Sequence, residues 1–461
     1  MNELKTLISQ VKAGDWEAIK DSKLLFVRSQ DHLAVHDSNA NGRVLTAFET
    51  ATYYPDKLME VLEYGVASLP CLRDEPADTI RSARESFGIS IEELARYTQV
   101  PEETIRDAEN SNSRTPILEL QKIAHALDID DAQLSINPKS DNHSFGYRLR
   151  TFSDDNTIEK KDVMAFAEAA WVAQTQLKLE SWLGFTADYP LCLFEKNPEY
   201  GNPNYRAWRI GYELAEKARE LLEVDQDHVF LRETCEKLGI PVIQTELSEN
   251  IAGATLSVAG MRAIVVANDR RHDDVLIRRM TIAHELGHLL WDTEENLNDI
   301  RVDTFDHIGE NPQFMNTVDD HDRYVEQRAN AFAVHFIGPI DHKFATGITD
   351  DTELVVNAVE KFGFSVTSAT YHLANRLGRN VTPQRINDES LDRGSWDGKE
   401  SFGIDLFPIS NVPVSRRGLF SYRVAKCYKE KLITISTASS YMKCSEEDFL
   451  RNVDLLTGMF E

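Results

Sequence analysis

Two histidines four residues apart place the strongest constraint on how this 461-residue chain folds. His284 and His288 lie in the run TIAHELGHLLW, whose apolar residues predict a buried helix. Residues i and i+4 share one face of a helix, so both imidazoles would project to the same place. Glu285 completes the pattern HExxH, in which two histidines bind zinc and the glutamate is a general base. The alternative is an ordinary helix that carries two histidines, because the short pattern also occurs by chance.

A second helical pattern, EQRANAFA, offers a further metal ligand. A catalytic zinc usually has three protein ligands, and Glu326 can be the third. Asn330 lies four residues later on the same face, where it would orient an imidazole or the glutamate carboxylate. The alternative for Glu326 is an exposed helix carboxylate. Two histidines and a glutamate suit Zn²⁺, and Mn²⁺ or Fe²⁺ can bind such a set as well.

The runs RRMTIAHELGHLLWD (278–292) and EQRANAFAVHFIGP (326–339) resemble the ImmA/IrrE family of zinc metallo-endopeptidases, and the resemblance covers about 205–380. It implies a gluzincin-like site with zinc bound by His284, His288 and Glu326 and with Glu285 as the catalytic base. It also implies limited cleavage of a repressor-type transcription factor, in a stress response or in the control of mobile elements and phage. Three residues are candidates for a second oxyanion donor: His321, Tyr324 and His335.

Residues 76–132 contain short helical patterns separated by turn signals. Ser90 and Glu93 predict a capping box at the start of one helix. The pattern resembles an XRE/lambda-repressor-like helix-turn-helix domain, and this resemblance makes Glu102–Glu109 the recognition helix.

The charge of this segment weakens the expectation of DNA binding. It has twelve acidic and six basic residues, and Glu102 and Glu103 lie where base contacts are expected. Carboxylates there repel phosphate, although Arg106, Arg114 and Lys122 could still meet phosphate oxygens. Binding to DNA, dimerisation and docking of a protein partner therefore all stay open.

The whole chain is acidic, with 76 Asp and Glu against 50 Lys and Arg, a net charge of −26. Such a chain does not bind nucleic acid or anionic membranes non-specifically. No apolar run approaches the ~20 residues needed to span a bilayer, the N-terminus lacks a secretory signal, and the five cysteines lack CxxC spacing. We therefore expect a cytoplasmic protein without a membrane partner.

The element pattern predicts a multidomain α+β fold that is mainly helical, with a small sheet in the metal-binding domain. GIPVI (239–243) and AIVV (263–266) are expected to be buried strands joined by a glycine-containing turn region. The expected segments are 1–75 (a module of unknown role), 76–132 (helix-turn-helix), 133–204 (linker and connecting helix), 205–380 (metallopeptidase) and 381–461 (helical C-terminal extension).

The acidic segment 293–321 joins the two helices that carry the metal ligands. We expect it to be a long loop, because it has little apolar periodicity. Placed there, it would lie at the mouth of the cleft and could act as a lid that orders on a substrate or partner. Its carboxylates, among them Asp299, Asp303 and Asp306, would attract a basic partner such as a DNA-binding repressor. The alternative is a solvated connector without a role.

Three functions are compatible with these sequence features. The first is a zinc endopeptidase fused to a repressor-like helix-turn-helix, whose protein substrate is a DNA-binding repressor. The second is a transcriptional regulator that uses the protease-like domain as a sensor. The third is a toxin–antitoxin or phage-defence component that acts by protein contacts. The intact set of His284, Glu285, His288 and Glu326 favours the first, and a homodimer is left open.

Overall fold

The fold is mainly helical and of the α+β class, as expected. The computed structural model describes residues 2–37, 41–69, 72–132, 134, 143–197, 200, 206–224, 229–258, 260–268, 274–308, 320–341, 343–386, 391, 396, 400 and 404–460. Contacts divide the chain into two compact units, which are residues 1–185 together with 406–461, and residues 186–405. This division is coarser than the five expected segments, which remain a prediction.

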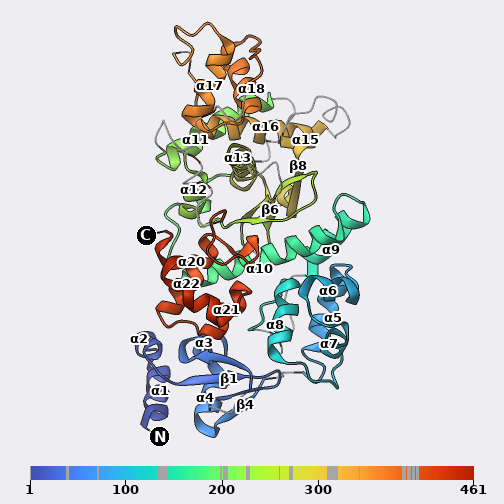
Figure 1. The fold of residues 1–461 in the computed structure, drawn as a ribbon, viewed down its shortest axis with the longest axis vertical. Coiled ribbons are helices and arrows are strands. Elements are labelled where there is room, and N and C mark those ends of the chain that lie inside the picture. Colours follow the sequence, from blue (N-terminus) through green and yellow to red (C-terminus); the bar gives the residue numbers. More distant parts are fainter. Residues whose placement is uncertain are drawn as a thin grey trace. The chain divides into compact units, whose positions relative to one another are not determined.

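Unit 1 joins the two ends of the chain (Figure 1). Its N-terminal elements are α1 (Asn2–Ala13), α2 (Trp16–Lys20), β1 (Leu25–Arg28), β2 (His32–Val35), β3 (Arg43–Thr46), α3 (Ala47–Tyr53), α4 (Pro55–Tyr64) and β4 (Val66–Ser68). The next are α5 (Ala77–Ser86), α6 (Ile91–Thr98), α7 (Glu102–Ala108), α8 (Ile117–Ala126), α9 (His143–Asp154) and α10 (Lys160–Trp182). The C-terminal ones are η5 (Val414–Arg416), α20 (Leu419–Lys429), α21 (Ile435–Met442) and α22 (Glu446–Gly458).

The sheet of unit 1 is antiparallel, with strand order β3-β1-β2-β4. Helix α10 is buried on nearly all sides, because apolar residues cover its circumference, and it packs against α8, α9 and α20. Trp171 of α10 stacks on His125 of α8, with ring centroids 3.8 Å apart. The expected connecting helix is therefore a core element of unit 1, and the helices of the C-terminal extension pack in the same unit.

Unit 2 carries the predicted metal-binding residues. Its elements are η1 (Leu191–Leu193), α11 (Ala207–Leu221), α12 (Leu231–Lys237), β5 (Val242–Thr245), β6 (Ile251–Ser257), β7 (Ala263–Ala267), α13 (Val275–Trp291), α14 (Glu294–Leu297), β8 (Asp299–Thr304), α15 (Phe305–Ile308), α16 (Asp320–Ile337), α17 (Asp351–Phe362) and α18 (Val366–Leu377).

The sheet of unit 2 corrects two expectations. Its strand order is β5-β7-β6-β8, so β5 and β7 are the predicted strands, but the expected turn region between them contains the buried strand β6. The expected acidic loop 293–321 begins instead with α14, β8 and α15, and β8 pairs antiparallel with β6. Strand pairing overrode local composition here, because backbone hydrogen bonds to β6 stabilise a strand whose own side chains are mostly polar. Residues 309–319 lie outside the described part.

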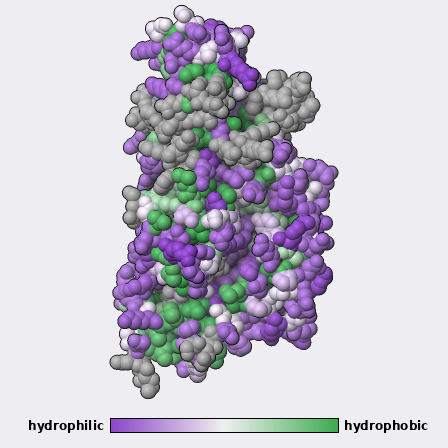
Figure 2. Space-filling view, viewed as in Figure 1, coloured by the Kyte–Doolittle hydropathy of each residue, from purple (hydrophilic) through white to green (hydrophobic). Residues whose placement is uncertain are grey.

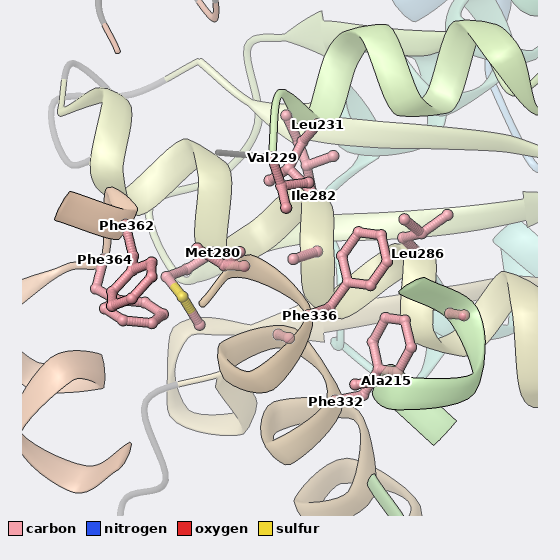
Figure 3. Close-up of a cluster of buried hydrophobic side chains, with 14 of the residues drawn as sticks. Ala215, Val229, Leu231, Met280, Ile282, Leu286, Phe332, Phe336, Phe362 and Phe364 are labelled. Atoms are coloured by element: carbon pink, nitrogen blue, oxygen red, sulfur yellow. The ribbon is translucent and has the colours of Figure 1, made fainter. Parts of the chain in front are cut away.

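A large apolar core holds the helices of unit 2 against this sheet. Figure 3 shows Phe332 and Phe336 of α16 beside Leu286 of α13 and Ala215 of α11. Gly287 permits the close approach of the two long helices, because a Cβ there would lie 2.8 Å from the Phe332 ring. The core therefore fixes α13 and α16 face to face.

Hydrophilic residues dominate the coloured surface in Figure 2, in keeping with the net charge of −26. None of the described helices is long and apolar enough to cross a bilayer.

Candidate functional site

Four buried side chains from three elements of unit 2 meet at one point. They are His284 and His288 from α13, Asp303 from β8 and Glu326 from α16, and one ligand atom from each lies within 4.8 Å of the others. The Nε2 atoms of the two histidines are 3.1 Å apart. Glu326 Oε2 is 3.2 Å from His284 Nε2 and 3.9 Å from His288 Nε2. The structure thus brings together all three residues predicted as ligands and adds Asp303.

The second nitrogen of each imidazole has a fixed partner. His284 Nδ1 lies 3.0 Å from Asn330 Oδ1, and His288 Nδ1 lies 2.8 Å from Asp292 Oδ2. Both oxygens accept, so each Nδ1 carries the proton and donates. In the neutral tautomers the two Nε2 lone pairs then face each other across 3.1 Å, where neither can donate to the other. A cation between them satisfies both, so this donor set fits a metal ion.

Glu285 lies at the same place without being one of the four clustered side chains. It is fully buried, and Gly253 of β6 is so near that a Cβ there would lie 2.9 Å from Glu285 Oε1. Burial raises the pKa of Glu285 well above its usual value, and the carboxylates of Asp303 and Glu326 raise it further. A divalent cation in the cluster would oppose this shift.

Charged residues that the sequence reasoning missed surround the cluster. Arg301 of β8 contacts Glu326, with Nε 3.1 Å from Oε1, and Arg328 of α16 contacts Asp292. Burial raises the pKa of Glu326, but Arg301 together with His284 and His288 outweighs this effect and holds the pKa well below its usual value. Asp292 follows His288 by four residues, a spacing that could have predicted the pair. Arg301 and Asp303 are two residues apart and therefore share one face of β8, but the acidic composition of this segment gave no sign of a strand.

The three candidates for a second oxyanion donor lie in different surroundings. Tyr324 is buried on α16, two residues before Glu326. His335 contacts α11 instead, with its ring stacked on Tyr212 at 4.6 Å and Nε2 3.1 Å from Glu216 Oε1. The side chain of His321 lies outside the described residues.

A cavity of about 240 Å³ opens beside the cluster. It shares Thr281 of α13 and Asn330 of α16 with the surroundings of the histidines, and its other walls are mainly apolar. Trp208 and Tyr371 line it and are 41% and 48% exposed, so the cavity communicates with the surface.

In unit 1, the predicted helix-turn-helix elements form. Ser90 and Glu93 make the expected capping box at the start of α6, and α7 coincides with the expected recognition helix to within one residue. Long-range contacts connect the helix-turn-helix region to the rest of unit 1. Arg43 pairs with Asp131, and Tyr97 lies 2.9 Å from Glu168. Just after the expected segment, Arg28 Nη2 donates to Leu134 O at 2.7 Å.

The three predicted phosphate contacts are already ion-paired. Arg106 lies 2.8 Å from Glu102, Lys122 lies 3.0 Å from Glu119, and Arg114 pairs with Asp31. All three basic side chains stay about half exposed or more, and such surface pairs contribute only about 0–1 kcal/mol. A phosphate group could therefore displace the acidic partners.

Comparison with known proteins supports this part of the chain. Residues 80–134 match the family described as Helix-turn-helix. A search of curated proteins finds no significant match. The chain thus contains an XRE-like helix-turn-helix domain, of the kind that DNA-binding regulators carry.

Proposed function

We propose that unit 2 is a metal-dependent endopeptidase of the ImmA/IrrE type, joined in one chain to a helix-turn-helix regulator domain. The observation that carries the proposal is the pair of Nε2 atoms 3.1 Å apart, with both Nδ1 atoms held by acceptors and Glu326 Oε2 next to them. Two histidines four apart on one helix and a glutamate from a second helix are the ligands of a catalytic zinc.

The charges in this pocket also favour a cation. Three buried carboxylates, Glu285, Asp303 and Glu326, lie near the guanidinium of Arg301. Asp303, Glu326 and Arg301 sum to −1, and ionisation of Glu285, whose pKa burial and the two neighbouring carboxylates raise, would bring the sum to −2. A divalent ion would cancel this charge and oppose the rise in the pKa of Glu285. Uncompensated buried charge costs several kcal/mol, so a buried group of this composition is typical of a metal site.

The roles of the side chains follow from their positions. His284, His288 and Glu326 would hold Zn²⁺, or Mn²⁺ or Fe²⁺, which supplies polarisation of the scissile carbonyl group. Glu285 would take a proton from the attacking water and pass it to the leaving amine. Asn330 and Asp292 would keep both imidazoles in the tautomer that binds metal.

The substrate we propose is a protein, specifically a repressor-type DNA-binding protein. The cavity that Asn330 lines, close to His284, offers space for an apolar side chain of such a substrate. The net charge of −26 would attract a basic partner over long range. Cleavage of such a protein would relieve repression in a stress response or in the control of mobile elements and phage.

A second candidate is a DNA-binding regulator that uses the metal site as a sensor. The match of residues 80–134 to helix-turn-helix domains favours it. A pure sensor has no need of Glu285, so the two candidates differ in what this residue does. Action by protein contacts alone, as in a toxin–antitoxin or phage-defence component, is the third.

Metal analysis with a cleavage assay tests the proposal. The purified protein should contain one metal ion per chain, and Glu326→Ala should lose it. The metal-loaded protein should cleave a repressor-type protein from a panel of candidates. A metal-loaded protein that cleaves none, but whose DNA binding changes with metal, would favour the sensor.

A further inference from the structure

We propose that Asp303 is a fourth metal ligand that keeps the site closed until strand β8 moves. This inference rests on the proposed metal site. Asp303 Oδ2 lies 3.8 Å from the Nε2 atoms of both His284 and His288. It is therefore about as near to both imidazoles as Glu326 Oε2 is, at 3.2 and 3.9 Å.

The four atoms have the arrangement that a tetrahedral ion needs. Ligand bonds of about 2.0–2.1 Å place neighbouring ligand atoms about 3.3 Å apart. Five of the six separations among the two Nε2 atoms, Asp303 Oδ2 and Glu326 Oε2 run from 3.1 to 3.9 Å, and one ligand atom from each residue lies within 4.8 Å of the others. An ion at the centre would bind all four after shifts of a few tenths of an ångström.

Arg301 directs one oxygen of each carboxylate toward the histidines. Its guanidinium contacts Glu326 Oε1 and lies 3.8 Å from Asp303 Oδ1, whereas Oε2 and Oδ2 are the atoms near the imidazoles. Both carboxylates would thus bind through one oxygen each.

Four protein ligands have a chemical consequence. Catalytic zinc sites have three protein ligands and leave the fourth position to water or substrate, whereas closed sites with four are structural. With Asp303 bound, the substrate carbonyl has no position at a tetrahedral ion. The structure is then that of a latent enzyme, which becomes active when Asp303 leaves.

Strand β8 is suited to such a movement. It lies at the edge of the sheet and, among the described strands, pairs with β6 alone. The pairing is irregular near Ile251 and Gly253, opposite the end of β8. At its start, Asn298 and Asp299 both have positive φ, 43° and 64°, which is an unfavourable conformation for Asp299. β8 can therefore shift at lower cost than α13 or α16, which the core holds.

Cobalt substitution tests this inference without relying on activity. The visible spectrum of Co²⁺ reports coordination number and ligand exchange. We would load wild type, Asp303→Asn and the control Asp299→Asn with Co²⁺ and titrate each with acetohydroxamate. Asp299 is on the same strand but outside the cluster. Circular dichroism and thermal unfolding would check that each variant folds.

The expected result is a four-coordinate Co²⁺ spectrum in wild type that acetohydroxamate does not change. Asp303→Asn should bind Co²⁺ at least tenfold more weakly, and its spectrum should respond to acetohydroxamate. Asp299→Asn should behave as wild type. A wild-type spectrum that changes with acetohydroxamate, absence of Co²⁺ binding, or equal Co²⁺ affinities of all three proteins would overturn the inference. If Asp303→Asn does not fold, the wild-type titration still decides.

Peptide cleavage separates this inference from the proposed function. If wild type cleaves slowly, Asp303→Asn should cleave at least tenfold faster, whereas equal or lower activity would overturn the latent state. If no variant cleaves while the cobalt results are as expected, the peptidase proposal fails and Asp303 remains a ligand.

Discussion

At the scale of single residues, Glu285 lies beside the four clustered side chains but is not one of them, so catalysis can be separated from metal binding. Replacing Glu285 by Gln removes the proposed base and keeps the volume of the side chain. We expect metal content and fold to be retained and cleavage to fall by about 10²-fold or more. Glu294→Gln, at an exposed glutamate of the same unit, is the control. Retained proteolysis in Glu285→Gln would show that the chemistry lies elsewhere.

At the scale of elements, the fit of β6 against α13 depends on Gly253. A Cβ there would lie 2.8 Å from Thr281 Cγ2 and 2.9 Å from Glu285 Oε1. Gly253→Ala should therefore push α13 away, lower the free energy of unfolding by about 1–3 kcal/mol and weaken metal binding. Gly458→Ala, at the last residue of α22, meets nothing within 4 Å, so it should leave metal binding unchanged and should not lower the free energy of unfolding. Equal behaviour of the two variants by calorimetry and metal titration would contradict this reading of the β6–α13 contact.

Helix α7, the expected recognition helix, and helix α8 carry basic residues that are ion-paired with acidic neighbours. We expect DNA binding by the full chain to be weak and steeply dependent on salt, because few cations are available. The double variant Glu102→Gln, Glu119→Gln releases Arg106 and Lys122 and should raise affinity by about tenfold, or about 1.4 kcal/mol. Glu447→Gln, which removes one of the two acidic partners of Arg451 on α22, is the control outside the helix-turn-helix and should have little effect. Tight wild-type binding that survives high salt, or equal affinities of the double variant and the control, would count against these contacts.

At the scale of the whole molecule, the two units are stabilised by different buried charges. In unit 1, Glu168 of α10 lies 2.9 Å from Arg416 and 2.8 Å from Lys443, and it accepts a hydrogen bond from Tyr97. Burial alone would raise the pKa of Glu168, but Lys443 and Arg416 outweigh it and hold this pKa far below its usual value. Ionised Glu168 thus stabilises unit 1 above the unfolded pKa of about 4.3, and this contribution is lost as the pH falls toward the lower folded value.

We expect calorimetry to resolve these contributions. Glu168→Gln should lower the free energy of unfolding of unit 1 by about 3 kcal/mol at pH 7 and should flatten its loss of stability below pH 4. Removing metal with a chelator should instead destabilise unit 2, by about 2.7 kcal/mol if the free ion had been at 100 times its Kd. If the chelator and Glu168→Gln lower the same transition, the two units do not unfold separately.

Local patterns in the sequence were enough to predict several helices and the candidate metal ligands on two of them. The i, i+4 spacing of His284 and His288 on an apolar helix predicts which way both imidazoles point, because helix geometry is a local property. The capping box of Ser90 and Glu93 is local in the same way, and the structure confirms it. Glu326 was expected near the histidines from its own helical pattern, and the structure places it there.

Only the tertiary structure shows that β8 brings Arg301 and Asp303 to the buried cluster. Asp303 and Arg301 lie in an acidic segment without clear periodicity, so nothing local distinguishes them from a solvated loop. Pairing with β6 makes the segment a strand and turns both side chains toward Glu326 and the histidines. Strand pairing joins residues about 50 positions apart and depends on a partner, so propensity alone cannot predict it. The sequence by itself therefore determined three of the four clustered residues, and the sheet supplied the fourth.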